Sequence, residues 1–392
     1  MIDRIINRCL VTPEDHRQQA RRRLPRFLAD YIEGGAGQEQ TLRANDQAWA
    51  EWWLRQRVLV DVEGVDTRAT LAGMDCAMPL ALAPIGLGGM TARRGEVQAV
   101  QAADQANIPF TLSTVGVCGI NEVAAAASAP FWFQLYMLRD RGIVEALLEQ
   151  AWAAGCQTLI FTIDLPMPGS RHRDARNGVG QPGWRPKALK VADVLSRPPW
   201  LWEVALRGKP LSLGSMTDHV ASAANPNAFQ RWVDAQFDPS VTWDDIAWLR
   251  ALWPGQLILK GILDADDARA AVEARADGLI VSNHGGRQLD GVAGTAACLP
   301  HIVKAVAGQA EVWVDGGIRS GIDVFKALAL GAQGALIGRP WVWALASGGQ
   351  SALSDLLAVF HKELRIAMAL TGATTVADIG PHCLDTETRQ AR

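Results

Sequence analysis

Eight short apolar runs recur along the chain, and the segments between them carry the periodicity of amphipathic helices. Several runs are apolar at every position, which is typical of parallel strands covered by helices outside and by packed side chains inside. Such alternation predicts an α/β protein, and eight repeats predict a (β/α)₈ TIM barrel. The expected strands are 80–84, 110–114, 131–136, 158–164, 257–261, 278–283, 311–317 and 334–338, with helices at 95–106, 143–154, 265–275 and 320–330.

One domain is expected to account for residues 1–392, because barrel enzymes commonly carry additions to their eight units. The interpretation is a helical preamble over 1–79, the barrel over 80–348, and a C-terminal helix and tail over 349–392. The regular spacing breaks between the fourth and fifth strands, where a weakly periodic inserted loop is expected at about 175–240. Loops of this length are usually lids or binding surfaces.

Charge and cysteine content argue against several classes of protein. The 38 basic and 41 acidic residues leave a net charge of -3, which does not favour a nucleic acid partner. The six cysteines form no C-x-x-C pair, which indicates reduced thiols and no metal site. No run reaches the roughly 18 apolar residues of a membrane span, and residues 1–20 lack the apolar core of a signal peptide. A cytoplasmic protein is therefore expected.

Polar side chains end most of the expected strands. Active-site groups of barrels lie at the C-terminal ends of the strands, where these side chains would meet in one ring. A single polar residue at a strand end is usually structural, but five such ends together indicate an active site. The residues are Gln134, Tyr136, Thr162, Asp164, Lys260, Ser282, His284, Asp315, Gly316 and Gly317.

The stretch SNHGGRQLD at 282–290 gives the most specific indication of catalytic chemistry. Arg287 can bind a carboxylate through two parallel hydrogen bonds, and the neutral imidazole of His284 can accept a proton beside it. Asp164 can orient that imidazole and stabilise its charged form, as a triad carboxylate does. This combination predicts an acid substrate that loses a proton.

A phosphate site is expected after the last two strands, at Asp315, Gly316, Gly317 and Arg319 and at Gly338 and Arg339. Glycines there leave backbone N–H groups accessible, and the arginines add charge. The rival motif G-x-G-x-x-G at 178–183 follows no expected strand and carries Pro182 where a helix should begin. Neither a zinc motif H-E-x-x-H nor a Walker lysine motif is present.

These features resemble the FMN-dependent 2-hydroxy-acid dehydrogenases and oxidases, over about residues 13–384. The likeness is strongest to the bacterial, membrane-associated branch that oxidises L-lactate. Besides 282–291, the motifs that carry it are YIEGGA (31–36), APIGLGGM (83–90), ARRGEV (92–97), FTLSTV (110–115), WFQLY (132–136), LRDRG (138–142), FDPS (237–240) and KGIL (260–263). Gly37 and Gln38 depart from the branch, in which an aromatic residue is common at this place.

The resemblance implies a role for each matched residue. FMN would lie across the barrel mouth, with Lys260 near its pyrimidine side and its phosphate at the glycine and arginine positions above. Arg171 and Arg287 would hold the substrate carboxylate, Tyr31 and Tyr136 would bind nearby, and His284 would take the proton. The flavin ring would be surrounded by Ala83, Pro84, Ser113, Gln134, Thr162, Lys260 and Ser282.

The implied reaction is oxidation of L-lactate to pyruvate, with electrons passed from FMN to a quinone or another non-oxygen acceptor. The alternatives are an oxidase that releases peroxide, a dehydrogenase for mandelate or another bulkier acid, a catalytically silent binding module, and a phosphate-sugar isomerase or aldolase. Basic and tryptophan residues between 184 and 213 suit peripheral contact with the cytoplasmic face of the inner membrane, although a solvated lid explains them equally. A homotetramer is expected from the resemblance.

Overall fold

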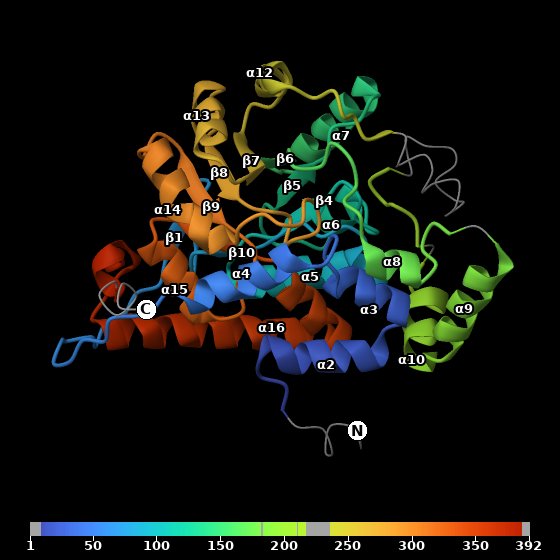
Figure 1. Cartoon of the computed structure of the whole chain (residues 1–392), viewed down its shortest axis with the longest axis horizontal. Coiled ribbons are helices and arrows are strands. Elements are labelled where there is room, and N and C mark those ends of the chain that lie inside the picture. The colour runs from blue at the N-terminus through green and yellow to red at the C-terminus, as the bar shows by residue number, and fades with distance from the viewer. Residues whose placement is uncertain (1–8, 182, 210, 217–235, 386–392) are drawn as a thin grey trace.

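The computed structural model describes residues 9–181, 183–209, 211–216 and 236–385 (Figure 1). Within these ranges an eight-stranded parallel sheet runs in the order β3-β10-β9-β8-β7-β6-β5-β4. A parallel bridge between Leu82 and Phe110 joins the two outer strands and closes the barrel. The strands are β3 (Leu80–Leu82), β4 (Thr111–Ser113), β5 (Trp132–Leu135), β6 (Thr158–Thr162), β7 (Gln256–Ile262), β8 (Gly278–Val281), β9 (Glu311–Val314) and β10 (Gly334–Ile337). The predicted (β/α)₈ TIM barrel is therefore confirmed.

Helices cover the outside of the barrel, each with one buried face. In α7, Val144, Leu147, Leu148 and Ala151 are buried at helical spacing, and Asp140 caps the helix by accepting from the backbone N–H of Gly142. The helices that follow the strands are α5 (Gly95–Ala106), α6 (Ile120–Ala124), α7 (Arg141–Ala153), α12 (Trp243–Leu252), α13 (Ala265–Glu273), α14 (Thr295–Val306), α15 (Gly321–Ala329) and α16 (Arg339–Thr371), with a short 3₁₀ turn η1 (Gly88–Met90) before α5.

Side chains fill the barrel interior, so it is a packed core. The indole rings of Trp132 and Trp313 stack inside it with centroids 5.1 Å apart. The hairpin of β1 (Ala69–Leu71) and β2 (Met74–Cys76) adds Leu71 and Cys76 to this cluster. The open end for chemistry is consequently the end where the strands finish.

The preamble forms three helices, α2 (Pro13–Arg23), α3 (Arg26–Glu33) and α4 (Gln40–Ala50). The first of them packs along α16, as the blue and red helices at the base of Figure 1 show. That long helix changes direction at Gly348 and Gly349, where the backbone leaves helical geometry. Two 3₁₀ turns, η3 (Val376–Asp378) and η4 (Pro381–Cys383), end the described chain.

The insertion contains more helix than its weak periodicity predicted. It forms α8 (His172–Arg176), α9 (Trp184–Leu195), α10 (Pro198–Trp200) and the π-helix η2 (Leu201–Leu206). No residue of α9 is buried, although its apolar residues Trp184, Val191 and Leu195 lie at helical spacing. A helix, α9, does begin directly after the motif at 178–183, so the expectation that no helix starts there is wrong. The element before this motif is α8 and not a strand, so it still lacks the strand of a dinucleotide-binding motif. Part of the expected loop, 217–235, lies outside the described residues, as does Pro182.

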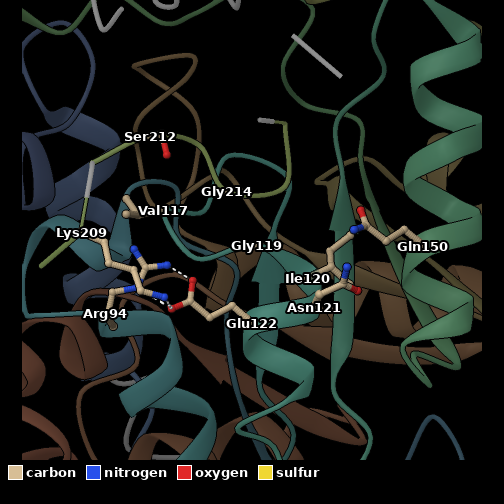
Figure 2. A pocket seen from close by; sticks show the side chains of 10 residues that line it. All are labelled: Arg94, Val117, Gly119, Ile120, Asn121, Glu122, Gln150, Lys209, Ser212 and Gly214. Atoms are coloured by element: carbon tan, nitrogen blue, oxygen red, sulfur yellow. Dashed lines mark hydrogen bonds and ion pairs between the residues drawn. The ribbon is translucent and has the colours of Figure 1, made fainter. Parts of the chain in front are cut away.

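The insertion contacts the barrel at two places, which we call its first return (residues 209–214) and its second return (residues 236–238). Figure 2 shows the first, where Glu122 accepts hydrogen bonds from Arg94 and from Lys209. There the backbone N–H of Gly214 also donates to the carbonyl of Gly116 at 3.1 Å. At the second return, Asp238 forms an ion pair of 2.8 Å with Arg141. The segment therefore rests on the side of the barrel mouth.

Candidate active site

The barrel topology brings the polar strand ends together in one ring. Strand pairing aligns Ser113 with Gln134, and Thr162 with Lys260, at the same level of the sheet. The loops after β8 and β9 are bonded to the preamble, because Arg287 donates to the Tyr31 carbonyl and the Trp49 indole donates to the Gly316 carbonyl. Chain segments far apart in sequence thus enclose one site.

His284 and Asp164 form the pair that was predicted for proton transfer. The imidazole Nδ1 lies 2.9 Å from Asp164 Oδ1, and Nε2 makes no hydrogen bond within the described residues. The backbone of His284 has φ of 55°, a left-handed conformation that few non-glycine residues adopt. Its N–H donates to Ser282 Oγ at 3.1 Å, which holds this turn in place. One ring nitrogen is therefore oriented and the other is available to a substrate.

Asp164 is held as a carboxylate. Burial opposes its ionisation, but the neighbouring His284 and the positive charge of Lys260 outweigh burial and lower the pKa of Asp164 below its usual value. A carboxylate in this place can orient the imidazole that it contacts.

Lys260 is almost fully buried and has two partners. Its Nζ donates to Ser282 Oγ at 2.7 Å and forms an ion pair of 2.7 Å with Asp315 Oδ2. The other carboxylate oxygen of Asp315 is buried with no hydrogen-bond partner in the described structure. One carboxylate oxygen of Asp315 is thus occupied by Lys260, and the other can accept a hydrogen bond. A negatively charged acceptor suits a hydroxyl group, which can donate, better than a phosphate, which is also negative.

Two guanidinium groups face one aromatic ring. Arg287 lies 4.7 Å and Arg171 5.5 Å from the centre of the Tyr31 ring. Burial, together with the like charge of Arg171, lowers the pKa of Arg287. Arg171 has Asp174 at 3.5 Å, whereas Arg287 donates only to the carbonyls of Tyr31 and Gly34 and has no carboxylate partner among the described residues. A half-buried cation without a counter-charge in the described structure is suited to bind an anion.

Tyr136 lies at the same site and stays protonated. Burial, followed by the negative charge of Asp164, raises the pKa of its phenol. Its ring meets Phe237, from the second return of the insertion, edge-on with centroids 5.3 Å apart. The phenol is therefore a hydrogen-bond donor held by the insertion.

A second group of cations lies where β9 and β10 end. Among the described residues, Arg339 donates only to the carbonyls of Ile32 and Gly34, and burial with the like charges of Arg287 and Arg319 lowers its pKa to about 9. Gly285 has φ of 65°, which favours glycine, and a Cβ there would lie 2.7 Å from Arg339 Nη1. Arg339 also begins α16, whose first N–H groups have no side-chain cap.

The other residues predicted for the phosphate site lie around Arg339 in different ways. Gly317 has φ of 82°, and a Cβ there would lie 2.3 Å from the Asn45 carbonyl. Arg319, by contrast, forms an ion pair of 3.1 Å with Asp46 and stacks over Trp343. The charge of Arg319 is already balanced by Asp46, whereas Arg339 has no carboxylate partner among the described residues.

A family model described as FMN-dependent dehydrogenase matches residues 20–386. The chain belongs to this family. Its cofactor is accordingly FMN, as the resemblance implied. Among sequence relatives, an L-lactate dehydrogenase of Caulobacter vibrioides is 51% identical over 365 residues, 93% of this chain and 95% of that protein. An L-lactate dehydrogenase of Allorhizobium ampelinum is 51% identical over 370 residues, 94% of this chain and 97% of that protein.

Solved structures of this family share the fold over nearly the whole chain. A monotopic membrane protein, (S)-mandelate dehydrogenase, matches with a TM-score of 0.91 and 32% identity, covering 97% of this chain and 100% of that one. A mandelate oxidase matches with a TM-score of 0.81 and 38% identity, covering 96% and 98%.

The residues present fit FMN. Gln134 Nε2 and Thr162 Oγ1 are buried polar atoms with no hydrogen-bond partner in the described structure, on neighbouring strands of the mouth. Ser113 Oγ donates to Gln134 Oε1 at 2.8 Å, which orients the unpaired amide nitrogen. Unpaired buried donors and acceptors are costly unless a ligand satisfies them. Ala83 and Pro84 follow β3 at the same end, and the Ala83 carbonyl already accepts from the Trp341 indole. No group of metal-ligating side chains occurs in the described residues.

Asn45 and Asn283 are structural members of the site that sequence reasoning gave no role. Each amide donates to the other at 2.8 Å, and Asn45 Oδ1 also accepts from the backbone N–H of Thr295. Asn283 Oδ1 accepts from the N–H of Gly286, so the pair supports the turn that carries His284. Asn283 lies inside the 282–290 motif and could have been noticed there. Asn45 lies in the preamble, and nothing in the sequence around it indicates that it contacts this motif.

Replacing Asn45 with alanine is expected to lower the free energy of unfolding by on the order of 3 kcal/mol, because several buried hydrogen-bonding groups lose their partner. Urea denaturation of the holoenzyme measures this. Asn121→Ala is a matched control, since that exposed amide makes no side-chain hydrogen bond to a described residue, and it should change the value by less than about 0.5 kcal/mol. Equal losses in both variants would contradict the structural role of the asparagine pair.

Gly37 has a local reason to be glycine. Its φ is 53°, and a Cβ there would lie 2.8 Å from a carboxylate oxygen of Asp290. That carboxylate accepts from the backbone N–H groups of Gln38 and Thr41 at the start of α4. Gly37, which stands where the resembled branch commonly has an aromatic residue, therefore lies at a close contact between the preamble and the 282–290 loop.

Proposed function

We propose that this chain is an L-2-hydroxy-acid dehydrogenase that oxidises L-lactate to pyruvate. The observation that carries this proposal is Arg287, a half-buried cation without a carboxylate partner, at the same site as the His284–Asp164 pair. A substrate carboxylate supplies the missing counter-charge, and His284 Nε2 takes the proton that the substrate releases. The names of relatives at about half identity favour lactate over other acids.

Each remaining residue has a proposed part in this reaction. Arg171 and Arg287 orient the carboxylate, and Tyr31 and Tyr136 bind the substrate beside it. Bound FMN supplies the two-electron acceptor, and Lys260 places a fixed positive charge where negative charge develops. The proposed FMN contacts are Ala83, Pro84, Ser113, Gln134, Thr162, Lys260 and Ser282 for the ring, Asp315 for a hydroxyl of the side chain, and Gly316, Gly317, Arg319, Gly338 and Arg339 for the phosphate region.

The proposed electron acceptor is a quinone, reached by peripheral contact with the cytoplasmic face of the inner membrane. The insertion exposes 73% of Trp184, 66% of Leu189, 56% of Trp202 and 65% of Leu206, beside basic residues such as Arg207. Indole rings and basic side chains on exposed helices suit the headgroup layer of a bilayer. In the described residues no helix is long and apolar enough to cross a membrane. The structural relative named as a monotopic membrane protein agrees with this mode of contact.

Self-association is a further part of the proposal. Val58 and Leu59 are 73% and 103% exposed on the segment that follows the preamble helices, an apolar tip that contact with another copy would cover. Light scattering of the purified protein gives the number of subunits, and a monomer at all concentrations would contradict a homotetramer.

Anaerobic addition of L-lactate is expected to bleach the visible band of the oxidised flavin, and the band is expected to stay bleached for minutes after air is admitted. Rapid recolouring with peroxide release would make the protein an oxidase instead. Bleaching by (S)-mandelate but not by L-lactate would favour the mandelate alternative, which the names of the solved relatives support. A protein that cannot take up FMN would contradict the proposal as a whole.

A further inference from the structure

A cavity of about 240 Å³ lies outside the barrel mouth, between parts of the chain that are distant in sequence. Arg23 at the end of α2 and Arg93 after η1 form one part of its wall. Trp200 and Glu203 from α10 and η2 form another, and Gly349 at the bend of α16 completes it. Figure 1 shows one end of α2 beside α10, the two helices that supply Arg23 and Trp200 to the cavity. None of these residues belongs to the catalytic site described above.

The charged side chains of this cavity are not neutralised by the protein. Arg93 and Glu203 are exposed, and neither has an ion-pair partner among the residues that the structure describes. Arg23 donates to the carbonyl of Ser347 at 2.7 Å and likewise has no carboxylate partner in those ranges. Two other arginines of α2 differ from Arg23, since Arg17 and Arg21 both form an ion pair with Glu33. The cavity therefore offers two cations and one anion to a ligand.

Exposed apolar side chains stand on the same helix as one wall of the cavity. The Trp200 indole donates to the Met90 carbonyl at 2.8 Å, which fixes α10 against the loop after β3. Trp202 and Leu206 stand on the same π-helix as Glu203, more than half exposed. A ligand in the cavity would thus have charged groups at one end and an apolar surface beside it.

We infer that this cavity binds the headgroup of a phospholipid that carries a primary ammonium group, such as phosphatidylethanolamine. Arg23 and Arg93 bind the phosphate, Glu203 accepts from the ammonium, and the acyl chains extend along Trp202 and Leu206 into the bilayer. Guanidinium groups bind phosphate with charge-assisted hydrogen bonds, and a headgroup with both charges matches the two cations and one anion. This inference rests on the membrane contact proposed above and adds a lipid preference to it.

Flotation of the full-length holoenzyme with vesicles tests the inference. Vesicles of phosphatidylcholine alone are compared with vesicles that contain added phosphatidylethanolamine or added phosphatidylglycerol. Phosphatidylethanolamine is expected to strengthen binding of the unaltered protein about fivefold over phosphatidylcholine, whose quaternary ammonium cannot donate a hydrogen bond to Glu203. Phosphatidylethanolamine also changes bilayer packing, so the variants decide whether the preference comes from this cavity.

Glu203→Gln should remove the preference for phosphatidylethanolamine while keeping binding to phosphatidylcholine. Glu203→Lys should in addition shift the preference to phosphatidylglycerol. Arg93→Gln should weaken binding to every vesicle about fivefold, as expected for one basic side chain at a phosphate. Arg22→Gln is the matched control, because Arg22 is exposed on α2 without a contact to the cavity, and it should change binding by less than Arg93→Gln.

The outcomes separate this inference from the proposal on which it rests. If the unaltered protein binds no vesicle, membrane contact and the headgroup site both fail. If it binds without a preference for phosphatidylethanolamine, or if Glu203→Gln keeps that preference, the headgroup site fails and membrane contact stands. Equal weakening by Arg22→Gln and Arg93→Gln would also overturn the site, because the attraction would then follow net charge alone. Flavin reduction by L-lactate in solution should be unchanged in all variants, which confirms that they are folded.

Discussion

Replacing His284 with alanine is expected to slow flavin reduction by L-lactate about 10⁴-fold while FMN remains bound. General base catalysis contributes up to about this factor, and His284 Nε2 is the proposed acceptor of the substrate proton. Asp164 stays ionised beside it and stabilises the positive charge that the imidazole acquires. Rapid mixing of the holoenzyme with L-lactate in the absence of oxygen measures the step directly from the loss of visible absorbance.

His301→Ala provides the control for this experiment. His301 is exposed on α14 and makes no side-chain hydrogen bond within the described part of the chain, so its loss should leave the rate within about a factor of two. Unchanged FMN content in both variants shows that the barrel mouth is intact. A His284→Ala enzyme that reduced its flavin at the full rate would show that another group takes the proton.

Strand positions follow from the sequence because burial on both faces leaves an unmistakable apolar run. All eight expected runs overlap an observed strand, and the expected helix at 95–106 coincides with α5. Strand ends are less well predicted, since the run 311–317 continues past β9, which ends at Val314. The residues beyond that point leave the ladder, and their glycines adopt left-handed conformations.

One helix of the insertion was missed. The twelve residues of α9 include no buried side chain, although Trp184, Ala188, Val191 and Leu195 recur at helical spacing. This spacing favours an amphipathic helix, so α9 could have been predicted from it, but the sequence does not show what the apolar face contacts. The extent of α16 was predicted only in part, because the C-terminal helix was expected within 349–392, whereas α16 begins at Arg339 and bends at Gly348 and Gly349.

The site illustrates a second limit of sequence reasoning. Residues within one motif, such as His284 and Arg287, can be proposed together because they follow one strand. The partners that hold them come from distant segments, as Asn45 does for Asn283 and Lys260 does for Asp315. Such pairings depend on how the preamble and the strands are arranged in space. The structure also distinguishes Arg339, which lacks a carboxylate, from Arg319, which has Asp46.

Replacing Arg287 with methionine is expected to lower kcat/KM for L-lactate on the order of 10³-fold. The loss of one partner from a buried, charge-assisted pair costs about 2–5 kcal/mol, and here the substrate carboxylate would lose its main counter-charge. Arg287→Lys should recover only part of the loss, because an ammonium group cannot form two parallel hydrogen bonds to a carboxylate. Steady-state kinetics with a soluble dye as acceptor measure both variants.

Arg22→Met is the matched control, because it removes an exposed arginine far from the ring of strand ends and should leave kcat/KM unchanged. FMN affinity should be nearly equal in all three variants, since Arg339 and the glycines of the β9 loop are the proposed phosphate contacts. An Arg287→Met enzyme with unaltered kcat/KM would show that Arg171 alone binds the carboxylate. Arg287 has no carboxylate partner among the described residues, so its removal leaves no described anion unpaired, and Arg287→Lys indicates how much of the loss comes from the donors that the carbonyls of Tyr31 and Gly34 also lose.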